Sequence, residues 1–355
     1  MKATFYDYNL PKEQIAQIPL ELRQTCKLMV VKRDNQSITH SRFESIKTYL
    51  KHDDLLVINN TKVVPAKLLL FKEKTHGKIE ALLVSKVSQD SDLWRVILSK
   101  KKGMNPGTVL ETEKKELTAL IKDLIEDEFL IEFKDSTGQA LSESIKEIGF
   151  APLPPYIKRK DKDSNKALQH KDILDYQTVF AKFDGSIAAP TAGMHFTPDL
   201  MKELSNFGIE FVQITHHIGK GTFKPIKTED IEKHNMDKEY YEIDSASADK
   251  INRAKLAGRR VIAVGTSSTR ALESSCKEPV RGLIEAGGTW SELFITDGYK
   301  YNVIDGMITN FHLPKSTNLV MTCVFGNREL ILKAYNEAVT SNYRFYSYGD
   351  AMLLT

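Results

Sequence analysis

Alternating and helical patterns of apolar residues organise the first 60 residues of the chain. The runs 27–33 (KLMVVKR) and 37–43 (SITHSRF) are β-rich and flank a polar turn, a pattern that predicts a hairpin. Apolar residues between Phe43 and Leu50 recur at helical spacing and predict a short helix. The segment 54–59 (DLLVIN) predicts a buried strand with a polar end at Asn59, Asn60 and Thr61. This order of elements is typical of an α/β layer.

The pattern changes to short strands and turns between residues 62 and 151. Five β-rich segments follow one another at the intervals of antiparallel barrels or sandwiches; they are VVPAKLLLF, KIEALLVSKV, DLWRVILS, GTVLE and EFLIEF. We therefore expect a small antiparallel β-barrel domain at 62–151, inserted into the rest of the chain. The strongly charged stretch 152–175 leads back, and a flexible loop is the simplest prediction for it.

The C-terminal part alternates strands and helices. Thr197 as N-cap, Pro198 and Gly208 predict a helix over 198–207, and further helices are expected at 246–257 and 329–341. Apolar strands are expected at 209–215 (IEFVQIT), 260–265 (RVIAVG), 290–296 (WSELFIT), 306–311 (GMITNF) and 319–325 (LVMTCVF). The fold class predicted is α/β: a discontinuous α/β domain, 1–61 and 152–355, with a mixed sheet or barrel-like core and the inserted barrel.

Composition narrows the class of protein. The chain has 355 residues, more than one hydrophobic core usually supports, so two domains are expected. A net charge of +3 is too small to indicate nucleic-acid binding through the overall field. Three cysteines without a CxxC pair argue against a disulfide framework. The sequence shows no signal peptide and no run long enough to span a membrane, so a cytoplasmic protein is expected.

Polar residues follow four of the expected strands and indicate a catalytic site. They are THHIGKGTF at 215–223, GTSSTR at 265–270, TDGYK at 296–300 and TNFHLPKST at 309–317. Ligand crevices of α/β sheets form outside the carboxyl ends of strands, so these segments should converge on one pocket. GTSSTR has the form of an anion site with Arg270 as a bidentate partner, although an ordinary Ser/Thr cap with a surface arginine is the alternative.

The segment 185–197 (GSIAAPTAGMHFT) carries almost no side-chain bulk, so its backbone amides can approach a ligand closely. We interpret it as a binding loop, with a tight packed connector as the alternative. His216 and His217 are adjacent and would face opposite ways on a strand, and no HExxH pattern exists. Acid–base or hydrogen-bonding work is therefore expected for His195, His217 and His312 rather than metal binding, and structural or surface roles for His216 and His234.

Five segments of the chain resemble, in the same order, the signature segments of the S-adenosylmethionine:tRNA ribosyltransferase-isomerase family. They are GSIAAPTAGMHFT, HIGKGTFKPI, VGTSSTRALES, ITNFHLPKST and YRFYSYGDAML. The N-terminal FYDYNLPKEQIAQIPLELR and LLVINNTKVVPAKL are similar too. The resemblance runs essentially the full length, is weakest at roughly 70–175, and is highly specific when the motifs are taken together.

The resemblance implies a late reaction of queuosine synthesis. The ribosyl part of S-adenosylmethionine is transferred to the aminomethyl group of 7-aminomethyl-7-deazaguanine at the wobble position of a tRNA with a GUN anticodon. Epoxyqueuosine is formed, and adenine and methionine are released. S-adenosylmethionine is then a consumed co-substrate, no metal or other cofactor is implied, and a monomer with a two-domain fold, an α/β domain with an inserted β-barrel, is expected.

The chemistry implied by the family can be matched to residues as hypotheses. Proton abstraction at C5′ beside the sulfonium needs a base, and His195 and His217 are the candidates. Alkoxide character needs donors, for which we expect Thr191, Thr222 or Ser268, while Arg270 would hold the methionine carboxylate. Asn310 and His312 would hold ribose hydroxyls, and Tyr348 with Asp350 would close the pocket. The other expected substrate contacts are Ser186, Ala189, Pro190, Gly193, Gly221 and Thr266.

Two basic segments are candidate tRNA contacts. They are Lys100, Lys101 and Lys102 at the edge of the expected barrel and Lys158 with Arg159 in the charged crossing, with solvated surface lysines as the alternative.

Several positions depart from the family pattern. Asp237 replaces the second histidine of an HxMHxE segment, Asp297 stands where proline is usual, and Cys26 with Lys27 replaces a Ser/Arg pair. None of these departures lies in the AAPTAG or NFHLP cores.

Three other classes of protein remain as alternatives. They are a metal-dependent hydrolase using His195, His217, His234 and Asp237, a non-catalytic RNA-binding protein, and a methyltransferase. The last would be expected to carry a glycine-rich loop after its first strand, and none is present near the N-terminus.

Overall fold

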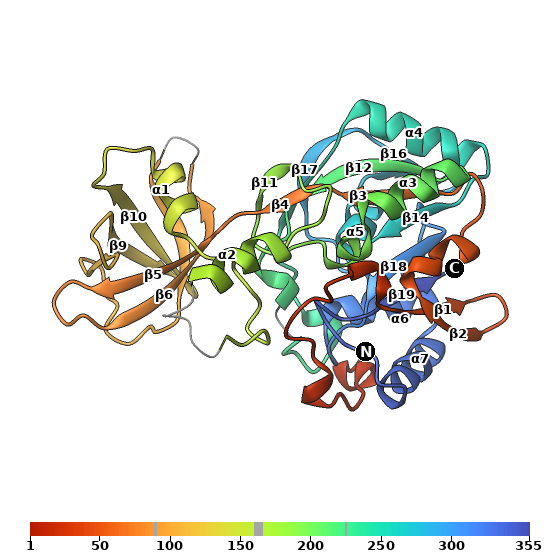
Figure 1. Ribbon diagram of the computed structural model, residues 1–355, viewed down its shortest axis with the longest axis horizontal. Coiled ribbons are helices and arrows are strands. Elements are labelled where there is room, and N and C mark those ends of the chain that lie inside the picture. Colours follow the sequence, from red (N-terminus) through yellow and green to blue (C-terminus); the bar gives the residue numbers. More distant parts are fainter. Residues whose placement is uncertain (89–90, 160–165, 224–225) are drawn as a thin grey trace. The chain divides into compact units, whose positions relative to one another are not determined.

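The computed structural model describes residues 1–88, 91–159, 166–223 and 226–355, without the side chains of 166–170 and 222–223 (Figure 1). It divides into two compact units. The first comprises Met1–Lys62, Pro154–Arg159 and Gln177–Thr355, and the second comprises Val63–Leu153 and Lys160–Tyr176. The expected division lay at 61/62 and 151/152.

A nine-stranded mixed sheet forms the first unit, in the order β17-β13-β12-β3-β14-β18-β19-β1-β2. Its strands are β1 (Lys27–Lys32), β2 (Ser37–Arg42), β3 (Leu55–Asn59), β12 (Glu210–His216), β13 (Glu239–Ile243), β14 (Val261–Val264), β17 (Gly287–Ser291), β18 (Gly306–Asn310) and β19 (Ala351–Leu354). The pairs β3–β12, β3–β14 and β14–β18 are parallel. The carboxyl ends of these four central strands therefore meet at one edge of the sheet.

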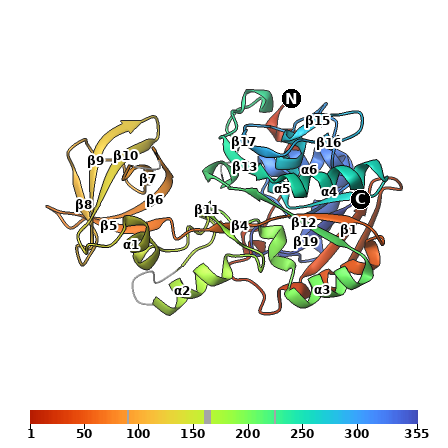
Figure 2. The same cartoon turned by 90° about the horizontal axis from the view of Figure 1, so that it is seen from above.

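Helices cover both faces of this sheet. They are α3 (Pro198–Phe207), α4 (Ser245–Leu256), α5 (Thr266–Ser274), α6 (Thr317–Gly326) and α7 (Arg328–Thr340). Leu55 and Val57 of β3 enter one hydrophobic core with residues of α4 to α7, whereas Leu56 and Ile58 enter a second core with Leu200 of α3. Figure 2 shows α3 on the opposite side of the sheet from α4, α5 and α6. A strand buried on both faces is apolar throughout, which explains the unbroken run of β3.

Short elements complete the first unit. The described residues include the 3-10 helices η1 (Ala3–Tyr6), η2 (Lys12–Gln14), η3 (Arg23–Thr25), η4 (Phe43–Tyr49), η5 (Thr191–His195), η6 (Lys220–Phe223) and η7 (Ile231–Lys233). Two further strand pairs are β11 (Phe183–Ser186) with β4 (Thr61–Val63) and β15 (Cys276–Glu278) with β16 (Leu283–Ile284).

The second unit is a closed antiparallel barrel in the order β10-β7-β6-β5-β8-β9. Its strands are β5 (Lys67–Lys72), β6 (Lys78–Lys86), β7 (Leu93–Leu98), β8 (Val109–Glu111), β9 (Leu117–Ile125) and β10 (Glu128–Asp135). Alternate residues such as Leu68, Leu70, Ile79 and Ala81 are buried and fill the interior. Helices α1 (Leu141–Ile148) and α2 (Lys166–Asp175) complete this unit. The predicted fold class, a mixed α/β domain with an antiparallel barrel, is confirmed.

Some predicted elements are wrong. The apolar run 319–325 lies in helix α6, because almost every side chain of that helix is buried and the run has no amphipathic period. The expected strand 290–296 ends at Ser291, whose hydroxyl accepts the backbone N–H of Leu293, so TDGYK does not follow a strand. Residues 166–175 of the charged crossing form α2 instead of a loop, and residues 160–165 lie outside the described part of the chain.

Candidate functional site

Asn59 ties three strand ends together at the carboxyl edge of the sheet. Its side-chain amide donates to the backbone oxygen of His216 at 2.9 Å and to the hydroxyl of Ser267 at 3.1 Å. Its carbonyl oxygen accepts the N–H of His216 at 3.0 Å. The ends of β3, β12 and β14 are thus held by one buried side chain, which fixes the positions of the polar residues that follow them.

The small-residue segment runs along this edge of the sheet. A Cβ at Gly185 would lie within 2.7 Å of the His217 ring, and the φ of +149° there also favours glycine. Ser186 accepts the N–H of Ile218 at 2.9 Å, which joins the segment to the end of β12. At the other end, a Cβ at Gly193 would lie 2.6 Å from Phe180. The lack of bulk therefore serves close packing against His217 and Phe180.

His195 is held through both ring nitrogens. Its Nδ1 lies 3.2 Å from the Sγ of Cys26, and its Nε2 lies 3.2 Å from the Nδ2 of Asn310. The same Nδ2 donates to the backbone oxygen of Tyr346 at 3.1 Å, while the Oδ1 of Asn310 accepts the hydroxyl of Thr191 at 3.2 Å. His195 is 5% exposed, so this network lies in the interior.

The neighbours of Asn310 determine the protonation of His195. The Tyr346 carbonyl only accepts hydrogen bonds, so the amide nitrogen of Asn310 must face it, and the same NH2 group faces Nε2 of His195. Nε2 is then the unprotonated nitrogen, and the proton sits on Nδ1 beside Cys26. Burial, followed by the charges of Arg23 and Arg344, lowers the pKa of His195 to about 3. The ring is neutral at physiological pH.

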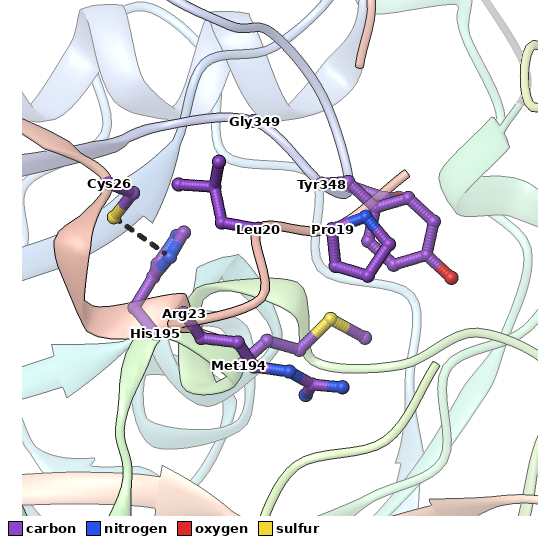
Figure 3. A pocket seen from close by; sticks show the side chains of 9 residues that line it. Pro19, Leu20, Arg23, Cys26, Met194, His195, Tyr348 and Gly349 are labelled. Atoms are coloured by element: carbon purple, nitrogen blue, oxygen red, sulfur yellow. Dashed lines mark hydrogen bonds between the residues drawn. The ribbon is translucent and has the colours of Figure 1, made fainter. Parts of the chain in front are cut away.

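A small pocket opens beside this histidine. It is lined by Pro19, Leu20, Arg23, Cys26, Met194, His195, Ser347, Tyr348 and Gly349. Figure 3 shows Cys26 hydrogen-bonded to His195 on one side of the pocket and Tyr348 beside Pro19 on the other. Burial raises the pKa of the Cys26 thiol, so that group remains a thiol. Tyr348, expected to close a pocket, is thus a wall residue here.

His217 has the more open ring of the two candidate bases. Its Nδ1 lies 2.8 Å from the hydroxyl of Thr61, and no hydrogen bond reaches its Nε2 from the described residues. Its ring stacks on that of Tyr240, with centroids 6.1 Å apart and planes 22° apart. Burial and then the neighbouring His216 lower its pKa below the usual 6.5, although Glu242 and Asp184 oppose this. A neutral imidazole with a free nitrogen is what a general base requires.

A buried ionic cluster lies on the other side of β12. The side chain of His216 is fully buried, with Nδ1 2.8 Å from the backbone oxygen of Ser267 and Nε2 3.0 Å from the carboxylate of Glu239. Arg270 also donates to Glu239, which accepts the N–H of Gly219 at 2.7 Å as well. Burial alone would raise the pKa of Glu239, but Arg270 and His216 lower it to about 2. Both ring nitrogens of His216 therefore face hydrogen-bond acceptors, a backbone oxygen and a carboxylate.

The remaining candidates lie at several places around this edge. Thr309 bonds Nε2 of His312 at 2.8 Å, and burial lowers the pKa of His312 to about 3. Ser268 donates back to the oxygen of Val264 at 2.9 Å, as a helix residue does, so its hydroxyl is already engaged. Ala189 and Pro190 are buried, Thr266 is partly exposed at the start of α5, and the side chain of Thr222 lies outside those described.

The carboxylates of Asp350 and Asp237 contact other segments of the protein. The carboxylate of Asp350 accepts the backbone N–H groups of Lys27 at 2.9 Å and Arg344 at 2.7 Å. A Cβ at Gly221 would lie 2.9 Å from the carboxylate of Asp237, so glycine allows these segments to touch. Within the described ranges, no group of three or more His, Cys, Asp or Glu side chains is arranged to hold a metal ion.

The basic candidates are mostly exposed. Lys100, Lys101 and Lys102 lie in the connection after β7, where Lys101 pairs with Asp127 at 2.5 Å. Lys158 is exposed, and Arg159 donates to the backbone oxygen of Gln17 at 2.9 Å. No helix of the described chain combines the length and apolar character that a membrane crossing requires.

Sequence reasoning missed Cys26, Glu239 and Tyr240 as site residues. Strand β13, which carries the last two, was not predicted, although EYYEI alternates between buried and less buried positions. That alternation was the available signal, because it places Glu239 and Tyr241 on one face and Tyr240 on the other. Cys26 gave no local signal, since its contact with His195 is 169 residues away in sequence.

Comparison with known proteins gives a consistent set of relatives. A family model described as "Queuosine biosynthesis protein" matches residues 3–354. The S-adenosylmethionine:tRNA ribosyltransferase-isomerase of Carboxydothermus hydrogenoformans is 45% identical over 354 residues, and that of Caldanaerobacter subterraneus is 44% identical over 354 residues, with all of each chain covered. The crystal structure of S-adenosylmethionine tRNA ribosyltransferase from Thermotoga maritima is similar with a TM-score of 0.54 and 29% identity, covering 99% of this chain and 100% of that one.

Proposed function

The chain belongs to the queuosine biosynthesis protein family, and from this membership we propose that it is an S-adenosylmethionine:tRNA ribosyltransferase-isomerase. It transfers and isomerises the ribosyl moiety of S-adenosylmethionine onto 7-aminomethyl-7-deazaguanine at the tRNA wobble position. Epoxyqueuosine forms on the tRNA, and adenine and methionine leave. The similarity to curated relatives over the whole chain supports this reaction above a hydrolase or a passive RNA-binding protein.

The geometry of His217 carries the proposed mechanism. The C5′ position next to a sulfonium is acidified, and a neutral imidazole with an open nitrogen takes a proton from it. Thr61 bonds Nδ1 of His217 and orients the ring, so Nε2 is the nitrogen that receives the proton. His195 is the weaker candidate, because Cys26 and Asn310 occupy both of its nitrogens.

We propose that Arg270 holds the methionine carboxylate. Its guanidinium is 6% exposed and donates to Glu239. Its Nε is buried and has no hydrogen-bond partner among the described residues. A buried donor without a partner costs free energy, and a substrate carboxylate would supply the missing acceptor.

The test follows two labels from S-adenosylmethionine into tRNA that carries the deazaguanine precursor. A ribosyl label is expected in the tRNA, whereas a methyl label stays with released methionine, which separates this reaction from methyl transfer. His217→Ala is expected to lower turnover at least 10²-fold. His52→Ala is the matched control, because that side chain is 68% exposed and pairs with Asp53. Methyl label in the tRNA, or no label at all, contradicts the proposal.

We also propose that the enzyme acts as a monomer in the cytoplasm, on tRNA with a GUN anticodon, and without a metal or bound cofactor. Lys100, Lys102 and Lys158 are exposed and suit contacts with tRNA phosphates. Native mass spectrometry tests the oligomeric state. Full turnover after dialysis against a chelator is expected, and activity that requires an added metal would overturn the cofactor proposal.

A further inference from the structure

Three aromatic rings form a row across neighbouring strands of the sheet. His217 follows β12, Tyr240 lies in β13 and Trp290 lies in the edge strand β17. The backbone N–H of His217 donates to the oxygen of Tyr240 at 2.8 Å, and Tyr240 is paired with Trp290 in register. Side chains that are paired across strands share one face of a sheet, so the three rings lie side by side. We call them the ring row.

The ring row is open at its outer end. Trp290 is 61% exposed, and its ring centroid lies 5.7 Å from that of Tyr240. Strand β17 stands at the edge of the sheet beside β13, and its first two residues are Gly287 and Gly288. A Cβ at Gly288 would lie 2.1 Å from the Tyr240 hydroxyl, so the glycine gives the tyrosine ring its place. The exposed Trp290 and the partly exposed Tyr240 together form an aromatic patch at the sheet edge, and patches of this kind mark surfaces that a ligand covers.

Positive side chains lie on elements next to the ring row. Phe183 is 46% exposed, and the ammonium group of Lys182 lies 4.9 Å from its ring centroid. Phe183 lies two residues before Gly185, the glycine that packs against His217. Two acidic groups also face this region: Glu242 accepts the Tyr240 hydroxyl at 3.4 Å, and Asp184 pairs with Lys62 at 3.6 Å. The charges nearly balance, so the aromatic faces define the ligand rather than a strong field.

We propose that the ring row is a stacking platform for an unstacked nucleobase of the tRNA anticodon loop. The inference rests on the proposed function, which requires a nucleobase of the anticodon loop to reach His217. Proteins recognise single-stranded RNA by stacking splayed bases on aromatic side chains, often on an open sheet face. A nucleobase stacked on Tyr240 and Trp290 would lie next to His217, the imidazole that we assign as the general base. Lys182 would then lie near the phosphate of that nucleotide.

Trp290 supplies a direct optical test. The chain contains two tryptophans, Trp94 in the barrel and Trp290, so a Trp94→Phe variant carries a single reporter. Titration with an anticodon stem-loop RNA with a GUN anticodon is expected to quench its fluorescence, because a stacked base contacts the indole face. A fully paired RNA of the same length is expected to quench it much less. Quenching by S-adenosylmethionine alone would overturn the proposal, since adenine would then be the stacking base.

Substitutions at Trp290 test the energetic role. Trp290→Ala is expected to weaken binding of the stem-loop roughly 5- to 100-fold, while Trp290→Phe keeps most of the affinity. Phe5→Ala is the matched control, since Phe5 is an exposed aromatic of the same unit at 51%. Equal affinities for wild type and Trp290→Ala, with normal ribosyl transfer, would overturn the platform and leave the proposed function intact. Quenching without ribosyl transfer would overturn the proposed function instead.

Discussion

The side-chain amide of Asn310 lies between His195 and the backbone of Tyr346, 3.2 Å from the ring Nε2 and 3.1 Å from the carbonyl oxygen. The carbonyl fixes which way the amide points, and the amide fixes which nitrogen of His195 is bare. A proton on Nε2 would face an NH2 group, so Asn310 and burial act together to keep this ring neutral. Asn310 is therefore a positioning residue.

Nitrogen NMR of labelled histidine tests this relationship. Wild-type His195 is expected to carry its proton on Nδ1 and to remain neutral from pH 8 to 5, because its pKa is lowered to about 3. Asn310→Asp offers a carboxylate to Nε2, so the ring is expected to gain a proton within that range and turnover to fall at least about 10-fold. Asn336→Asp, on the exposed face of α7, is the control. A wild-type proton on Nε2 would refute the assignment.

The pH dependence of turnover should follow His217. Its pKa is lowered below 6.5, and the base works when neutral, so kcat/KM is expected to rise with pH with a midpoint below pH 6.5. Glu242 opposes the lowering, so Glu242→Gln is expected to move the acid limb to still lower pH. Steady-state kinetics between pH 5 and 8 check this. An acid limb above pH 7, or one unmoved by the substitution, would count against His217 as the base.

The buried cluster should carry a large share of stability. Glu239→Gln leaves the buried Arg270 guanidinium and the His216 ring without their carboxylate, and breaking such a buried pair costs about 3–5 kcal/mol of unfolding free energy. Glu242→Gln, exposed on the same strand, is expected to change it by less than about 0.5 kcal/mol. Urea unfolding measures both variants. Similar small losses of unfolding free energy in Glu239→Gln and Glu242→Gln would show that the buried cluster does not stabilise the fold.

Acid should destabilise the protein through its buried histidines. His195 and His312 have pKa values of about 3 in the folded chain against 6.5 in the unfolded chain, so the unfolded chain binds their protons first. The contribution of the two neutral rings to the free energy of unfolding is complete above pH 6.5. It is lost as pH falls toward 3, at about 1.4 kcal/mol per pH unit for each ring. His312→Gln is expected to make the loss between pH 6.5 and 4.5 shallower. An unchanged slope in urea unfolding would contradict this.

Much of the fold follows from local pattern. The N-cap of Thr197 and the left-handed Gly208 bound α3 as predicted, because these signals act within one turn of the helix. Helix α6 was misassigned because a helix buried on nearly every side has no period to detect. Strand β19 went unrecognised, since Ala351–Leu354 is short and lies between β1 and β18, its partners in the interior of the sheet.

The site was less accessible from sequence than the fold. Polar strand ends and the small-residue segment were expected to converge at the carboxyl edge of the sheet, and the structure brings several of them together there, because strand direction is a property of the α/β pattern. Which histidine has an open nitrogen depends on tertiary partners instead. Asn310 and Cys26 surround His195 from distant parts of the chain, and Thr61 leaves one side of His217 open. Sequence spacing carries no information on those contacts.

The most direct measurement is mass spectrometry of the products made by the purified chain. It is incubated with S-adenosylmethionine and tRNA carrying 7-aminomethyl-7-deazaguanine, and the digested tRNA and the supernatant are both analysed. The account predicts epoxyqueuosine in the tRNA with equal amounts of free adenine and methionine. Unchanged precursor and no adenine, from folded protein that binds the tRNA, would contradict the ribosyl-transfer activity at the centre of this account.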